Sequence, residues 1–141
     1  MPAKVKKSLN TIFMERTKHI YRHQEERAAK LGVALDYSRE ELRAFVKHRL
    51  GVAPGCYYCG SLLNELNFSF DHKQPVSRGG TFLLDNLCCC CDSCNLAKHD
   101  LTEPEYTQLL NVICTWTEEA RKRFLARLRF GGNAFRPKRK A

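Results

Sequence analysis

The sequence has no long hydrophobic run. Among its 141 residues, no stretch approaches the roughly 20 consecutive apolar residues that a membrane-spanning helix requires. The segment Met1–Lys7 also lacks the apolar core of a secretory signal. We therefore expect neither a membrane protein nor a secreted one, and we predict a cytoplasmic location.

Acidic residues are scarce relative to basic ones. The chain holds 15 Asp and Glu against 24 Lys and Arg, which gives a formal net charge of +9 and a pI of about 9.3. A positive excess of this size indicates a polyanionic partner, most often a nucleic acid. The length is that of one domain with a helical appendage.

The N-terminal third favours helices. Residues 14–31 are rich in helix-forming residues and contain no Gly or Pro, and Gly32 follows them. Because their apolar positions are few, we expect this helix to lie on a surface or on a partner protein, preceded by loosely ordered residues. Ser38 and Glu41 form a capping box before a second helix, which we expect to end at Gly51.

The middle of the chain changes character. Residues 68–71 alternate as in a β-strand, and residues 81–84 are expected to lead into a second short strand. Thr102 and Glu105 form another capping box, and Thr117 is expected to cap the last helix. We therefore predict an α+β fold with a small β-containing centre between helices.

Eight cysteines in a chain without a secretory signal indicate metal ligands rather than disulfides. Cys56 and Cys59 form one CxxC pair, and Cys91 and Cys94 form a second. Two such pairs from separate loops can close a tetrahedral four-thiolate zinc site, so we predict structural Zn²⁺.

The second pair is ambiguous, because Cys88 and Cys91 also have CxxC spacing. Cys94 is preferred because it leads directly into the segment that carries Asn95. Cys88, Cys89 and Cys90 then fall on a strand as small apolar residues or, less simply, have a redox role. Cys114 is expected in the core of a helix stripe.

Polar residues suited to phosphodiester hydrolysis lie between and just after the cysteine pairs. Neutral imidazole, as in His72, can take a proton from water near pH 7, and a carboxylate such as Asp71 can bind a divalent cation. The two are adjacent, so they must sit at a strand end or bulge to act together. Asn95 and His99 have i, i+4 spacing and can share one helix face.

The segment from Cys56 to Asp100 resembles the HNH endonucleases, which have a ββα-metal (treble-clef) fold and, in many members, a four-cysteine zinc knuckle. The resemblance lies in the patterns CxxC, DHxxPxSRGG, LDNL and CxxCNxxKxD, taken in order. It covers about a third of the chain directly, and the helix after Thr102 resembles the one that follows the motif in bacterial and phage members.

The resemblance implies a role for each matching residue. His72 corresponds to the general base, Asp71 to the ligand of a catalytic Mg²⁺ or Mn²⁺, Asn86 to the residue that orients the base loop, and Asn95 to the position that completes the metal site. His99 falls where some members carry a further metal-binding histidine; the alternatives are a phosphate contact and an ordinary surface residue. Arg78 and Lys98 are expected to contact phosphate or, more simply, to be solvated surface charges.

We therefore divide the chain into four regions: a basic helical region at 1–51, an HNH nuclease core at 52–101, C-terminal helices that pack on the core at 102–132 and a basic disordered tail at 133–141. The predicted function is metal-dependent hydrolysis of DNA by a bacterial or phage enzyme, with RNA as the alternative substrate. The rival interpretation is a non-catalytic zinc module that only binds nucleic acid. The N-terminal helix could also dock the protein on a protein partner.

Overall fold

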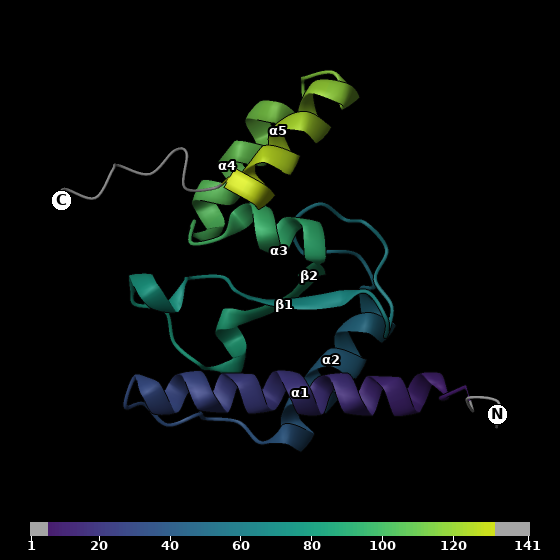
Figure 1. Cartoon of the computed structure of the whole chain (residues 1–141), viewed down its shortest axis with the longest axis vertical. Helices are drawn as coiled ribbons and strands as arrows, with labels where there is room; N and C mark the ends of the chain where they lie inside the picture. The colour runs from purple at the N-terminus through teal and green to yellow at the C-terminus, as the bar shows by residue number, and fades with distance from the viewer. Residues whose placement is uncertain (1–5, 132–141) are drawn as a thin grey trace, which may run out of the picture.

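The computed structural model describes the backbone of residues 6–131 and the side chains up to residue 128, and the predicted tail at 133–141 lies outside the described residues. Five α-helices, two β-strands and two short 3₁₀ helices make up this part of the chain (Figure 1). In chain order they are α1 (Leu9–Lys30), α2 (Arg39–Val52), β1 (Phe68–His72), η1 (Val76–Arg78), η2 (Leu84–Asn86), β2 (Leu87–Cys91), α3 (Asp92–Lys98), α4 (Glu103–Ile113) and α5 (Glu118–Gly131). The predicted α+β class is confirmed.

A two-stranded antiparallel sheet lies at the centre of the molecule. β1 pairs with β2 so that Asp71 lies opposite Cys88 and Phe68 opposite Cys91. Residues 81–84 lead into the second strand as predicted, although η2 lies between them and the strand begins only at Leu87. Before this strand begins, the Asn86 side chain donates hydrogen bonds to the backbone carbonyls of Gln74 and Thr81.

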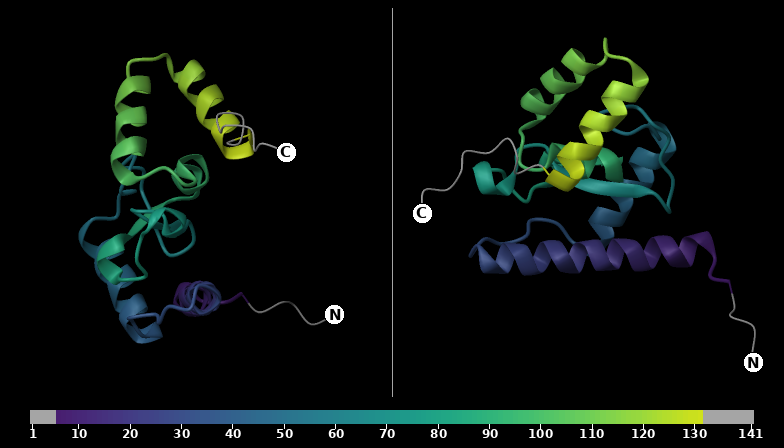
Figure 2. Two further views of the ribbon diagram at one scale, coloured as in Figure 1. Left: turned by 90° about the vertical axis from the view of Figure 1, so that its left-hand side faces the viewer. Right: turned by 45° about the horizontal axis from the view of Figure 1, so that its top comes forward.

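The helices cover the sheet from two sides. α1 and α2 pack together on one side, while α3, α4 and α5 lie on the other, as Figures 1 and 2 show. α3 follows β2 directly and contacts both strands. The chain therefore presents a ββα unit enclosed between an N-terminal and a C-terminal pair of helices.

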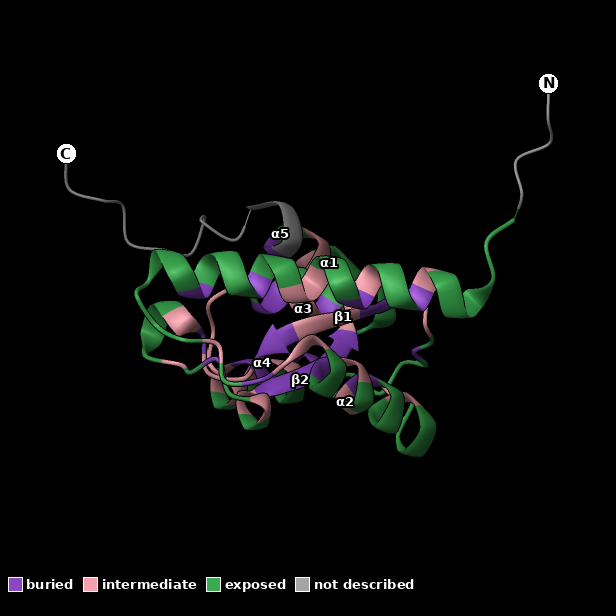
Figure 3. Cartoon of the chain, turned by 90° about the horizontal axis from the view of Figure 1, so that it is seen from below, coloured by how far each residue is buried: buried purple, intermediate pink, exposed green. Residues whose placement is uncertain are grey.

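α1 is longer and better anchored than the sequence predicted. It begins at Leu9, because the Ser8 hydroxyl accepts a hydrogen bond from the backbone N–H of Thr11 at 3.1 Å. Its inner face buries Phe13 and Ala28 together with the polar side chains of Thr17 and Gln24, whereas its outer face is exposed (Figure 3). Because Thr17 and Gln24 are polar, the buried face of α1 is not recognisable in the sequence as an apolar stripe.

The helix caps were predicted with mixed success. Ser38 caps α2 as predicted, with the Glu41 N–H bonded to its hydroxyl at 3.1 Å, but the helix continues through Gly51 to Val52. The capping box of Thr102 and Glu105 is confirmed in full. At the start of α5, the Thr117 hydroxyl accepts a hydrogen bond from the backbone N–H of Ala120 at 3.2 Å.

Cys114 does not lie in the core as predicted. It is the exposed C-cap of α4, while Tyr106 and Ile113 fill the buried stripe of that helix. Within residues 6–131, no helix combines the length and the apolar character that crossing a membrane requires.

Candidate functional site

Four cysteine thiols meet at the junction of β2, α3 and the turn at 56–60. The Sγ atoms of Cys56, Cys59, Cys91 and Cys94 all lie within 4.8 Å of one another. The Sγ atoms of Cys59 and Cys91 are 3.7 Å apart, which matches the edge of about 3.8 Å in a tetrahedron with Zn–S bonds of 2.3 Å. The choice of Cys91 and Cys94 over Cys88 as the second pair therefore agrees with the structure.

Backbone N–H groups point at two of these sulfurs, as expected for thiolates that bind a cation. The N–H of Cys91 donates to Cys56 Sγ at 3.2 Å, and that of Cys94 donates to Cys91 Sγ at 3.3 Å. Gly60 closes the first turn in a left-handed conformation, with φ of +76°, that few other residues adopt. The cluster fits a structural zinc ion, because four thiolates leave no position for substrate.

The remaining cysteines of the run lie in the sheet. Cys88, Cys89 and Cys90 are all buried in β2. Burial, and then the neighbouring charge of Cys88, raises the pKa of the Cys89 thiol to about 12, so that this side chain is uncharged at neutral pH. These residues therefore have the environment of the small apolar strand residues that the sequence predicted.

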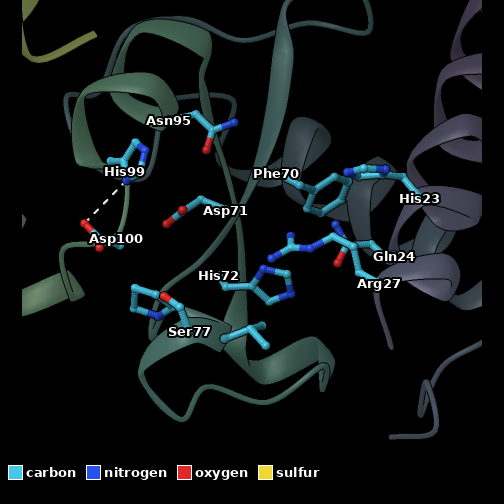
Figure 4. A pocket seen from close by; sticks show the side chains of 12 residues that line it. His23, Gln24, Arg27, Phe70, Asp71, His72, Ser77, Asn95, His99 and Asp100 are labelled. Atoms are coloured by element: carbon cyan, nitrogen blue, oxygen red, sulfur yellow. Dashed lines mark ion pairs between the residues drawn. The ribbon is translucent and has the colours of Figure 1, made fainter. Parts of the chain in front are cut away.

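A cleft of about 400 Å³ opens beside the end of β1. Asp71 and His72 both line it, because β1 ends at His72 and lets neighbouring residues face one space. Figure 4 shows the carboxylate of Asp71 on the side of α3 and the ring of His72 on the side of α1. The full lining is His23, Gln24, Arg27, Phe70, Asp71, His72, Pro75, Val76, Ser77, Asn95, His99 and Asp100.

Asp71 is a buried carboxylate held by two donors. The Tyr58 hydroxyl donates to Oδ2, and the Lys98 ammonium lies 3.0 Å from the same oxygen. Burial raises the pKa of Asp71, while Tyr58 and Lys98 act in the opposite direction. Both donors use Oδ2, so Oδ1 remains available for a cation.

His72 is a buried, neutral imidazole. It is 8% exposed, and burial, followed by the charges of Arg27 and Lys98, lowers its pKa to about 4. Its Nε2 has no hydrogen-bond partner within residues 6–131. At neutral pH this ring is therefore uncharged.

Asn86 fastens the loop that follows His72. Its Oδ1 accepts the backbone N–H of Gln74 at 2.9 Å, and its Nδ2 donates to the carbonyls of Gln74 and Thr81. Gly80 lies so close that a Cβ there would approach Gln74 O to 1.9 Å. Asn86 thus has the geometry of a residue that orients the loop bearing His72.

Residues 56–111 match the model of the HNH endonuclease family. This segment is therefore similar to the HNH endonucleases. The comparison with curated proteins found no match.

The HNH segment places Asn95 and His99 on the cleft, but not on one helix face. α3 ends at Lys98, and His99 adopts φ of 51° and ψ of −117° outside it. This conformation is strained for any residue other than glycine, and such strain typically costs about 1–3 kcal/mol. Nδ1 of His99 lies 3.4 Å from Oδ1 of Asp100.

The expectation that Lys98 of the HNH motif contacts phosphate is wrong, and so is the simpler expectation of a solvated charge. Its side chain is completely buried, and its ammonium contacts Asp71 and donates to the backbone carbonyl of His72 at 3.0 Å. The apolar stem crosses the interior to reach these two residues, which a motif spacing does not reveal. Lys98 therefore contacts both Asp71 and His72 and fixes their positions.

Arg78 of the HNH motif is partly exposed and contacts α4. Its guanidinium forms an ion pair with Glu105 and donates to the carbonyl of Asp100 at 3.4 Å. The contact ties the loop before η2 to the C-terminal helices, and a phosphate role for Arg78 stays a prediction.

Three residues of the cleft lie far outside the HNH segment and were not predicted. His23, Gln24 and Arg27 belong to α1, and they form the wall opposite α3 (Figure 4). His23 and Arg27 are one helical turn apart, but no sequence pattern indicates that this helix packs against the motif.

Proposed function

We propose that this protein is a metal-dependent endonuclease that hydrolyses phosphodiester bonds of DNA. The observation that carries the proposal is the cleft in which the buried carboxylate of Asp71 and the unprotonated ring of His72 meet. The cysteine cluster supports it, because Cys94 directly precedes Asn95 and fixes the helix that bears it.

The oxygen donors of the cleft fit a small divalent cation. Asp71 offers a carboxylate and Asn95 an amide oxygen, which are the ligand types that Mg²⁺ and Mn²⁺ prefer, and His99 could add a nitrogen. Such a cation supplies charge neutralisation at the scissile phosphate and at the leaving oxygen. Tyr58 and Lys98 keep the carboxylate in place for it.

His72 acts as the general base in this proposal. Its uncharged ring takes the proton of the attacking water, and Lys98 fixes its backbone through the carbonyl oxygen. Asn86 prevents the loop at 73–86 from carrying the ring out of the cleft. Each of these roles belongs to a residue that lies in or beside the cleft.

One observation favours a second candidate, a zinc-stabilised module that binds nucleic acid without cutting it. The ammonium of Lys98 already neutralises Asp71 at 3.0 Å, so the carboxylate has a partner without any added cation. An endonuclease should cleave the nucleic acid when divalent metal is added, whereas a binding module should leave it intact.

The decisive experiment is nicking of supercoiled plasmid with and without Mg²⁺ or Mn²⁺. His72→Ala should lose about 10²–10⁴-fold in rate, the usual contribution of a positioned base. Asp71→Asn should lose rate but recover part of it at high metal concentration, whereas His72→Ala should not respond. His48→Ala, on the exposed surface of α2, is the matched histidine control.

Circular dichroism, zinc content and DNA affinity should be unchanged in His72→Ala, so that its lost rate reports chemistry. If His72→Ala cuts as fast as the native protein, the assignment of the base is wrong. If the native protein binds DNA but cuts neither DNA nor RNA with any divalent metal, the binding module takes its place.

A further inference from the structure

We propose that α1 is the phosphate-binding wall of the cleft and that Arg27 contacts the backbone of the bound nucleic acid beside His72. The proposal rests on the proposed function and assigns substrate binding to a helix outside residues 56–111, the segment that matches the family. It thereby names the surface on which the substrate strand lies.

The cleft continues along α1 as a groove. A second hollow of about 290 Å³ shares His23, Gln24, Phe70 and Asn95 with the first and extends to His19. From His19 to Arg27 the helix rises about 12 Å. Along the axis of duplex DNA one strand advances by one phosphate every 3.4 Å, so a groove of this length parallel to the axis spans three to four phosphates.

The two walls of the cleft carry opposite charge. Arg27 is exposed and forms no ion pair within the described part of the chain, and no acidic residue of α1 lines either hollow. The acids of the cleft, Asp71 and Asp100, lie on the side of α3 (Figure 4). A phosphate that enters beside His72 therefore meets an unpaired guanidinium on one side and the candidate metal ligands on the other.

Gln24 gives an independent sign that a ligand occupies this groove. Its side chain is only 8% exposed, it lines both hollows, and its Oε1 has no hydrogen-bond partner among residues 6–131. A buried amide oxygen without a partner is costly, and a turn of the terminal amide would bring this oxygen to a donor in the groove and remove that cost. A sugar hydroxyl or a base amino group is such a donor.

Arg16 makes α1 a fixed wall rather than a loose arm. Its guanidinium donates to the carbonyls of Leu66 and Phe68 and lies over the Phe68 ring, 4.5 Å from its centroid. These contacts join α1 to the start of β1. Arg27 therefore has a defined position relative to the strand that ends in His72.

The test compares Arg27→Gln with Arg22→Gln. Both changes remove one positive charge from α1, but Arg22 lies on the exposed side, where it pairs with Glu26. Binding of a fluorescent DNA duplex is measured by anisotropy in EDTA over a range of salt concentrations, so the readout does not depend on cleavage. Plasmid nicking with Mg²⁺ is measured in parallel, with melting curves to confirm folding.

Arg27→Gln should lower the slope of log affinity against log salt by about one, since each phosphate contact contributes about 0.9. Between 50 and 200 mM salt, native affinity should therefore fall about 3.5-fold more than that of the variant. KM for nicking should rise more than kcat falls. Arg22→Gln should keep the native slope.

The proposal is overturned if the two variants have the same salt slope. If the native protein still cuts in that case, the proposed function stands and only the role of α1 is wrong. If the native protein neither binds nor cuts nucleic acid, both proposals are wrong.

Discussion

Asp71 combines two properties that usually exclude each other. It is buried, which favours the protonated form, yet its proposed role requires a charged carboxylate. Tyr58 and Lys98 oppose this effect by donating to Oδ2, but burial outweighs them and the pKa of Asp71 stays above its usual value. A buried ion pair of this kind is sensitive to loss of one partner, because the other charge is left without compensation.

Lys98→Met should therefore destabilise the protein strongly. Methionine preserves the length of the side chain but removes the ammonium, so the variant should lose about 3 kcal/mol in the free energy of unfolding. Urea denaturation measures this loss, and Lys47→Met, at an exposed site on α2, is the control. Equal, small effects of both changes would show that the buried pair contributes little.

The lowered pKa of His72 predicts an unusual pH dependence. An exposed imidazole with a pKa near 6.5 would be only about one-tenth neutral at pH 5.5. Because burial lowers the pKa of His72 to about 4, its base form should persist, and nicking should change little between about pH 7.5 and 5.5. Initial rates across this range test the expectation, and a tenfold loss would contradict it.

The same shift has a defined consequence for stability. The unfolded chain binds the proton more readily than the folded one, so stability is complete above about pH 6.5 and declines as the pH falls towards 4. Circular dichroism at each pH therefore has to accompany the rates, to separate loss of the base from loss of the fold.

At the scale of elements, the metal ligands and the cleft residues share the same short segments. β2 ends at Cys91, and α3 carries Cys94, Asn95 and Lys98 within two turns. A helix of seven residues has little stability of its own. Its position, and hence that of Asn95, depends on the cysteine cluster at its first turn.

Cys59→Ser should therefore unfold the core rather than only slow the reaction. Structural zinc supplies free energy that is part of folding, so loss of one thiolate should abolish cooperative melting as well as zinc binding. Cys114→Ser is the matched control, because Cys114 is exposed and outside the cluster. Elemental analysis and melting curves decide, and a metal-free, well-folded Cys59→Ser protein would refute the structural role.

The sequence predicted those features that depend on nearby residues. The cap at Thr102 and the strand at Phe68 follow from short patterns, and the cysteine pairs follow from spacing. Features that depend on tertiary contacts were missed. The burial of Lys98 and the place of Arg27 on the cleft arise because α3 and α1 pack on opposite sides of β1, which no local pattern encodes.

At the scale of the whole molecule, one core joins the N-terminal and C-terminal helices to the sheet. The same buried cluster contains Phe13 of α1, Val46 of α2, Phe68 of β1 and Leu128 of α5. The first three regions expected from the sequence therefore share apolar contacts between residues 6 and 128.

Unfolding should accordingly be a single transition. Trp116, the one tryptophan of the chain, packs against Phe124 of α5 with ring centroids 5.4 Å apart, whereas α1 and α2 contribute many of the helical residues seen by circular dichroism. In a urea titration the two signals should have the same midpoint. A separate, fluorescence-silent transition would show that α1 and α2 unfold independently.

Because Lys98 is buried, its chemical reactivity also reports whether α3 has separated from the sheet. Amine-acylating reagents reach exposed lysines such as Lys47, but they cannot reach an ammonium sealed between Asp71 and the His72 carbonyl. Lys98 becomes acylated only in molecules whose α3 has left the sheet. Peptide mass spectrometry would measure how much Lys98 is acylated, and hence the fraction of molecules in which α3 is detached. That fraction should rise as a chelator removes metal from the cysteines at the other end of the same helix.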